Sequence, residues 1–210
     1  MAGFFLYTLD AEAFEQLITA PTKGQCLSAA DLVLDELDEL LVEYDGDDAA
    51  DPDKWPTDRL VLAKAIRKRL VSPDWYSDLT WGDAAIWSDL VFQLIQDDGM
   101  DFSNENDGLL YWDAAALAVK HGAPLMTEAT FGRAGFRYAG VSVTDLDLMF
   151  TVFEPDQVQL LLEELEAVAP HFETLPATPE GDRDQFFRGL LEPVRRAAAD
   201  GRVLWVQTDT

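Results

Sequence analysis

The stretch PDQVQLLLEELEAV at residues 155–168 determines more of the fold than any other part of the sequence. Its apolar residues recur at spacings of three and four, which is the period of an α-helix with one buried face. Pro155 suits the first turn of such a helix, where its missing N–H is not needed. The stretch VLWVQ at residues 203–207 is typical of a buried strand. The predicted core residues of this helix and strand are Leu161, Leu162, Leu165, Val203, Leu204 and Trp205.

Further elements can be placed outward from this pair. Predicted strands, rich in aromatic and β-branched residues, lie at 4–8, 136–143 and 148–153. Periodicity and capping residues predict further helices at about 11–20, 28–44, 58–71, 80–96, 111–120 and 182–199, and a polar loop at 97–108. Because strands lie at the start, middle and end with helices between them, the sequence predicts an α+β fold. We expect a small mixed or antiparallel sheet with several packed helices, in a single compact domain over residues 1–210.

Capping residues predict where two of these helices begin, and one proline predicts an irregularity in the last. Ser28 with Asp31 resembles a capping box, in which two side chains three residues apart each accept the other residue's backbone N–H. The pair Thr80 and Asp83 repeats this pattern and predicts a second helix start. Pro193 falls inside the last predicted helix and should kink or divide it, because proline lacks the N–H that the helix requires.

The charge of the chain is strongly negative, with 40 Asp and Glu against 15 Lys and Arg and a net charge of −25. Such a surface repels nucleic acid and anionic membranes and attracts basic partners. The alternative is that the charge only keeps the protein soluble. The sequence shows no signal peptide and no apolar run long enough to span a membrane. We therefore expect a cytoplasmic protein that binds neither membrane nor nucleic acid directly.

The acids are densest at residues 31–53, where eleven acids occur without a base. Like charges at this density repel one another, and a basic partner would relieve that repulsion. The alternative is an ordinary solvated face of a helix and a loop. The candidate partner-binding acids are Asp35, Glu36, Asp38, Glu39, Glu43, Asp45, Asp47 and Asp48.

A second candidate binding feature is a group of aromatic residues set among acids, which consists of Trp75, Tyr76, Trp81 and Trp87. Aromatic rings beside carboxylates suit the capture of Arg or Lys side chains through cation–π contacts and ion pairs. The alternative, favoured by the usual burial of tryptophan, is that these rings form core between helices. On the binding interpretation, the candidate partner-binding residues also include Trp75, Tyr76 and Trp81.

The sequence contains no pattern for a metal, a cofactor or a catalytic residue. The aspartates that begin at Asp45 lack the glycine and glutamate that a calcium loop needs at its sixth and twelfth positions. Zinc sites need clustered ligands, whereas Cys26, His121 and His171 lie far apart in the sequence. We expect Cys26 to be a buried thiol and each histidine to be a structural residue at a helix end. Motifs for a nucleophile or for phosphate binding are missing as well.

Both ends of the chain resemble YfbM-like bacterial proteins. The stretch FFLYTLDAEAFEQLI at residues 4–18 has the strand, turn and helix with which that family begins. The stretch FFRGLLEPVRRAAADGRVLWVQ at residues 186–207 is similar to the family's last helix and strand. The resemblance implies a cytoplasmic bacterial α+β protein of unknown function, and it assigns no active-site residue.

These observations favour a non-enzymatic acidic binding or inhibitor protein that neutralises a basic partner. Its most concrete form is an immunity-like protein whose partner is a toxin or a nucleic-acid-binding protein. Two alternatives stay open at this point. One is a hydrolase with a carboxylate-based site that the sequence does not reveal. The other is an acidic mimic of nucleic acid that occupies a DNA-binding protein.

Overall fold

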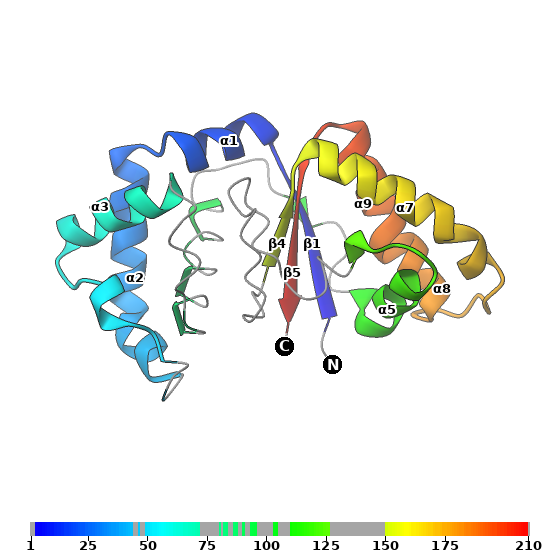
Figure 1. The fold of residues 1–210 in the computed structure, drawn as a ribbon, viewed down its shortest axis with the longest axis horizontal. Coiled ribbons are helices and arrows are strands. Elements are labelled where there is room, and N and C mark those ends of the chain that lie inside the picture. Colours follow the sequence, from blue (N-terminus) through cyan, green and yellow to red (C-terminus); the bar gives the residue numbers. More distant parts are fainter. Residues whose placement is uncertain are drawn as a thin grey trace. The chain divides into compact units, whose positions relative to one another are not determined.

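The computed structural model describes residues 3–43, 46, 49–71, 80, 82–83, 86–87, 90, 93–95, 103–104, 110–126 and 150–209 (Figure 1). The contacts within the chain divide it into two compact units. The sheet unit comprises residues 1–11, 101–137 and 149–210. The helical unit comprises residues 12–100 and 138–148. A single domain over residues 1–210 stays a prediction.

The sheet unit is built around five antiparallel strands. They are β1 (Gly3–Leu9), β2 (Ser103–Asn104), β3 (Leu110–Tyr111), β4 (Phe150–Phe153) and β5 (Val203–Asp209). Strand β5 lies between β1 and β4, while β2 and β3 both pair with the other edge of β1. In the register of the sheet, Val206 is opposite Leu6 on one side and Thr151 on the other. The predicted α+β class is confirmed, and the described strand pairs are antiparallel.

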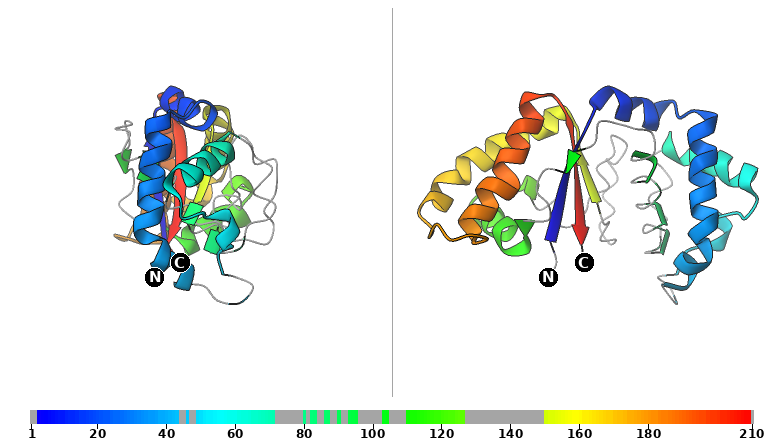
Figure 2. Two further views of the ribbon diagram at one scale, coloured as in Figure 1. Left: turned by 90° about the vertical axis from the view of Figure 1, so that its left-hand side faces the viewer. Right: turned by 180° about the vertical axis from the view of Figure 1, so that it is seen from behind.

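One face of this sheet forms a core with the helices of the same unit. Alternation along the strands places Leu6, Phe153 and Leu204 on that face, and all three are buried. The helices α5 (Trp112–Lys120), α7 (Pro155–Glu173), α8 (Asp182–Asp184) and α9 (Glu192–Ala199) lie on this side of the strands in the front and back views (Figure 1, Figure 2). All six residues predicted to form the core are buried, which confirms that prediction.

Helix α7 begins where the sequence predicts and ends later. Pro155 occupies its first turn, and the backbone N–H of Glu154 donates to Gln157 Oε1 at 2.9 Å. The helix continues past Val168 to Glu173, because Phe172 extends the apolar stripe by one more turn. The Phe172 ring is buried and stacks on Phe186 with 3.7 Å between the ring centroids.

The helix predicted at about 182–199 is present as continuous helical backbone from Asp182 to Ala199, and before Pro193 its hydrogen-bond pattern changes. After the single turn of α8, residues Gln185–Leu191 form a π-helical segment, labelled η4, and α9 follows. At the end of this segment the backbone N–H of Glu192, the first residue of α9, donates to the carbonyl of Phe187, five residues earlier. The wider turn accommodates Pro193, which has no N–H to donate and whose ring would crowd a regular α-helical carbonyl.

The helical unit contains α1 (Ala11–Thr19), α2 (Lys23–Glu43), the short 3₁₀ helix η2 (Pro52–Lys54) and α3 (Arg59–Leu70). Helix α2 begins before the predicted start near residue 28. The capping box is formed by Thr22 and Gln25, whose backbone N–H groups each donate to the other side chain at 2.6 and 3.2 Å. The prediction of a capping box at Ser28 and Asp31 is therefore wrong.

The segment that follows α3 is described in part. Thr80 and Asp83 form the predicted capping box, with both reciprocal hydrogen bonds at 3.1 Å. The predicted strand 136–143 lies outside the described residues. Strand β2 lies within residues 97–108, so the prediction of a loop is wrong at Ser103 and Asn104. Two polar residues are too few to show the alternation that predicts a strand. In the described part of the chain, no helix is long and apolar enough to cross a membrane.

Candidate functional site

The acidic segment of residues 31–53 begins on helix α2. Asp35 is exposed, and the helical backbone continues from it through Glu43. The side chains of four candidate acids on α2 lie outside the described part of the chain, namely those of Glu36, Asp38, Glu39 and Glu43. Three further candidates in the loop also lie outside it, namely Asp45, Asp47 and Asp48. The contact of these acids with a partner stays a prediction.

One acid of this segment has an internal partner that the sequence did not indicate. Asp31 on α2 accepts two hydrogen bonds from the guanidinium of Arg59 on α3, from Nε to Oδ1 at 2.5 Å and from Nη2 to Oδ2 at 2.6 Å. The hydrogen bond from Arg59 lowers the pKa of Asp31. This pair joins the two helices, so the charge of Asp31 is already balanced within the unit.

The other end of the acidic segment is held by Asp83, which has no exposed surface. Its Oδ1 accepts hydrogen bonds from the Trp55 indole at 2.8 Å and from the backbone N–H of Asp51 at 2.9 Å. Its Oδ2 accepts from Lys54 Nζ at 2.6 Å and from the backbone N–H of Thr80 at 3.1 Å. Four donors from two separate stretches of the chain thus converge on one buried carboxylate.

This arrangement explains the ionisation of Asp83. Burial alone would raise the pKa of Asp83, but the hydrogen bonds from Lys54, Trp55 and the two backbone amides lower it below its ordinary value. The guanidinium of Arg69 lies over the Trp55 ring at 4.6 Å and donates to the backbone carbonyl of Lys54. All of these donors come from the protein itself, so the group anchors the loop after α2 and is structural in character.

The aromatic candidates are only partly described. Three of them lie outside the described residues, namely Trp75, Tyr76 and Trp81, and their role in binding stays a prediction. Trp87 has no exposed surface, which confirms for this ring the alternative that it belongs to the core. Trp55 is also buried, and in the described part of the chain its ring engages a cation, the guanidinium of Arg69. The sequence did not single out Trp55, because its contact with the cation depends on how α3 packs.

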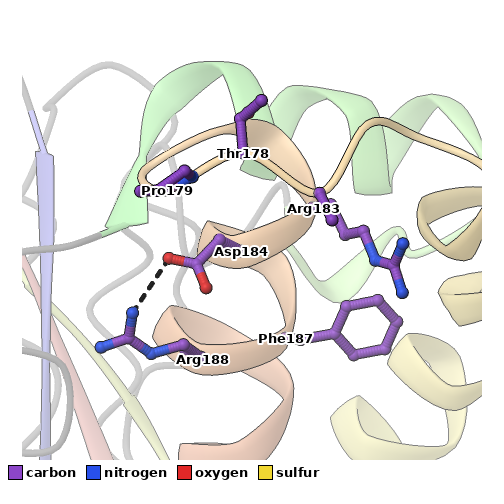
Figure 3. A pocket seen from close by; sticks show the side chains of 7 residues that line it. Thr178, Pro179, Arg183, Asp184, Phe187 and Arg188 are labelled. Carbon is purple, nitrogen blue, oxygen red and sulfur yellow. Dashed lines mark hydrogen bonds and ion pairs between the residues drawn. The ribbon is translucent and has the colours of Figure 1, made fainter.

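A pocket of about 460 Å³ lies in the sheet unit, between the loop after α7 and the last helix (Figure 3). Its lining comprises Ala177, Thr178, Pro179, Arg183, Asp184, Phe187 and Arg188. Arg188 Nη1 forms an ion pair with Asp184 Oδ2 at 3.0 Å. Arg183 lies beside the Phe187 ring, on the other side of the pocket from that pair (Figure 3), and forms no ion pair with a described residue. A cation beside an aromatic ring suits a small anion with an apolar part.

The loop wall of this pocket is fixed by its own hydrogen bonds. The backbone N–H of Gly181 donates to the carbonyl of Thr178 at 3.1 Å and closes a turn. Glu180 occupies the third position of the turn with φ of 58°, a conformation that favours glycine. Gln185 Nε2 donates to the carbonyl of Glu180 at 2.6 Å and ties the turn to the last helix. The pocket wall is therefore formed before any ligand binds.

The two histidines, His121 and His171, are far apart in the sequence but in contact in the structure. The rings of His121, after α5, and His171, in the last turn of α7, stack with centroids 4.1 Å apart and an interplanar angle of 18°. Desolvation lowers the pKa of His121, and the charges of His171 and Lys120 lower it further. Two stacked rings cannot both carry a proton without repulsion. The sequence carried no signal for this pair, because contact depends on the packing of α5 against α7.

The remaining candidate ligands do not cluster. Cys26 is buried on α2, as predicted, and burial raises the pKa of its thiol. Among the described residues, no three His, Cys, Asp or Glu side chains gather as metal ligands.

Comparison with known proteins found no match for this chain among protein-family models, curated proteins or solved structures. The resemblance of the two ends to YfbM-like proteins therefore stays a prediction.

Proposed function

We propose that this chain is a non-enzymatic acidic binding protein that recognises and neutralises a basic protein. In the most concrete form of the proposal it is an immunity-like protein in the bacterial cytoplasm, and its partner is a toxin or a nucleic-acid-binding protein. The observation that carries the proposal is the run of eleven acids without a base at residues 31–53, in a chain of net charge −25. A field of this sign steers a basic partner toward the surface and accelerates its encounter.

The first part of this run stands on a rigid platform, which supports the proposal. Helix α2 is capped by Thr22 and Gln25, and its first half is anchored by four buried residues, Cys26, Ala29, Ala30 and Val33. The bidentate pair between Asp31 and Arg59 ties α2 to α3. A partner that docks on α2 would therefore meet a preorganised helix and would not have to order it.

The test compares two charge-reversal variants that change the net charge equally. In the first variant, Glu36, Glu39 and Glu43 on α2 are replaced by Lys. In the matched control, Glu163, Glu173 and Asp200, which are exposed in the sheet unit, are replaced by Lys. Each protein is used to capture partners from an extract of the source cells, and the association rate of the purified partner is then measured at several salt concentrations.

We expect a basic partner whose association with the α2 variant is at least about tenfold slower than with the control, and whose association with the wild type slows as salt rises. A partner that is acidic would contradict the proposal. So would equal rates for the two variants together with no effect of salt.

A further inference from the structure

Helix α3 has a composition opposite to that of the rest of the chain. Residues 59–71 contain five of the fifteen Lys and Arg residues and no acid. Two of the five cations have internal roles, since Arg59 pairs with Asp31 and Arg69 lies over Trp55. The other three, Lys64, Arg67 and Lys68, are exposed and form no ion pair with a described residue.

The same side of α3 also exposes large apolar side chains. Leu60, Val61 and Val71 have 56%, 50% and 44% of their surface exposed, and they are three of the four large apolar residues so exposed in the described part of the chain. The opposite side of the helix packs into the core, where Leu62 and Ile66 are buried. Helix formation itself is secured by Asp58, whose side chain accepts the backbone N–H groups at the first turn.

Helical geometry gathers these exposed residues into one surface. At about 100° per residue, the exposed residues fall within an arc of about 120°, and the helix is about 18 Å long. The surface, called here the α3 face, consists of Leu60, Val61, Lys64, Arg67, Lys68 and Val71. Cations near the end of a helix stabilise its dipole, but this effect accounts neither for Lys64 in the middle nor for the exposed apolar residues.

We propose that the α3 face is a docking site for an acidic amphipathic helix of a partner protein. Charge complementarity selects this occupant, because three exposed cations that form no ion pair with a described residue suit carboxylates, and the apolar residues between them suit an apolar stripe. This site is separate from the acidic segment of the proposed function and opposite to it in charge. The inference therefore holds or fails independently of that function.

Two other occupants fit the observations less well. Nucleic acid carries a much denser negative charge than a helix with a few carboxylates, so the net charge of −25 opposes its approach more strongly. Its phosphates would also leave the apolar side chains of the α3 face without contacts. A second copy of the chain would bring two strongly negative molecules together through unlike surfaces, an arrangement that does not close into a dimer.

A display library of random 16-residue peptides provides the probe. The full chain is the target, and a K64E/K68E variant serves for counter-selection. We expect enriched peptides that combine Asp or Glu with apolar residues at helical spacing. Binding of an enriched peptide should weaken about tenfold or more in K64E/K68E. It should weaken similarly in L60S/V61S, which removes the apolar contacts and keeps the charge.

Controls separate these effects from net charge and from loss of fold. The K23E/K120E variant reverses two exposed lysines elsewhere, and L160S removes an exposed apolar residue of α7. Both controls should bind the peptide like the wild type, and circular dichroism should show that all variants are folded. The inference is overturned if no acidic peptides are enriched, or if L60S/V61S binds unchanged. It is also overturned if a 20-nucleotide oligothymidine binds more tightly than the peptide, or if the free protein self-associates through this face.

Discussion

Replacement of Asp83 by Asn tests how the helical unit is held together. The Asn side chain keeps the shape of Asp83 but has only one oxygen. If that oxygen takes the place of Oδ1, it retains the bonds from Trp55 and from the backbone of Asp51. The amide nitrogen then takes the place of Oδ2, where it faces two donors, Lys54 Nζ and the backbone N–H of Thr80.

The expected loss follows from these contacts. The Lys54 side chain is 22% exposed, so loss of its partner Asp83 costs less than the about 3–5 kcal/mol of a fully buried ion pair. Each donor left unsatisfied adds about 1–3 kcal/mol. We therefore expect D83N to lower the free energy of unfolding by about 3–5 kcal/mol. Urea denaturation at pH 7, followed by tryptophan fluorescence, measures this change. D53N replaces an exposed acid in the same part of the chain and should change stability by less than about 0.5 kcal/mol.

The dependence on pH gives a second measurement on the same variant. The folded-state pKa of Asp83 lies below its ordinary value. Its contribution to stability is therefore present above the unfolded-state pKa and is lost as pH falls through the folded-state pKa. The difference in free energy of unfolding between the wild type and D83N should become smaller as the pH is lowered. A loss below about 1 kcal/mol at pH 7, or a difference that does not change with pH, would refute this account of Asp83 as the anchor.

Further predictions concern the core, a close contact and the histidine pair. Leu165→Ala should lower the free energy of unfolding by about 2–5 kcal/mol in urea denaturation, because Leu165 is fully buried; a change below about 1 kcal/mol would contradict its place in the core. Gly82→Ala should cost about 1–3 kcal/mol in the same assay, because a Cβ there would lie 2.4 Å from the backbone nitrogen of Ala50, and an unchanged stability would show that the contact is looser. In an NMR titration, His121 should have a pKa below its ordinary value, and His171→Ala should raise it by removing a like charge; no rise would mean that desolvation alone acts.

The sequence determined the parts of the fold that depend on periodicity within a short stretch. The helix from Pro155, the strand at residues 203–207 and their buried residues are confirmed, because apolar spacing alone reports which side of an element is buried. The capping box of Thr80 and Asp83 is confirmed for the same reason, since its two residues are three positions apart. The acidic segment of the candidate site was equally evident, because charge density requires no knowledge of the fold.

Only the tertiary structure decided how residues distant in the sequence meet. The sequence predicted a capping box at Ser28 and Asp31, but Thr22 with Gln25 forms the box at the start of α2, and Asp31 pairs with Arg59, 28 residues away. Asp83 was recognisable as a cap, but its further role as the buried acceptor of Lys54 depends on how α3 and the following segment pack. The stacked histidines arise in the same way. Such contacts leave no local pattern, because their energy depends on positions that the whole fold supplies.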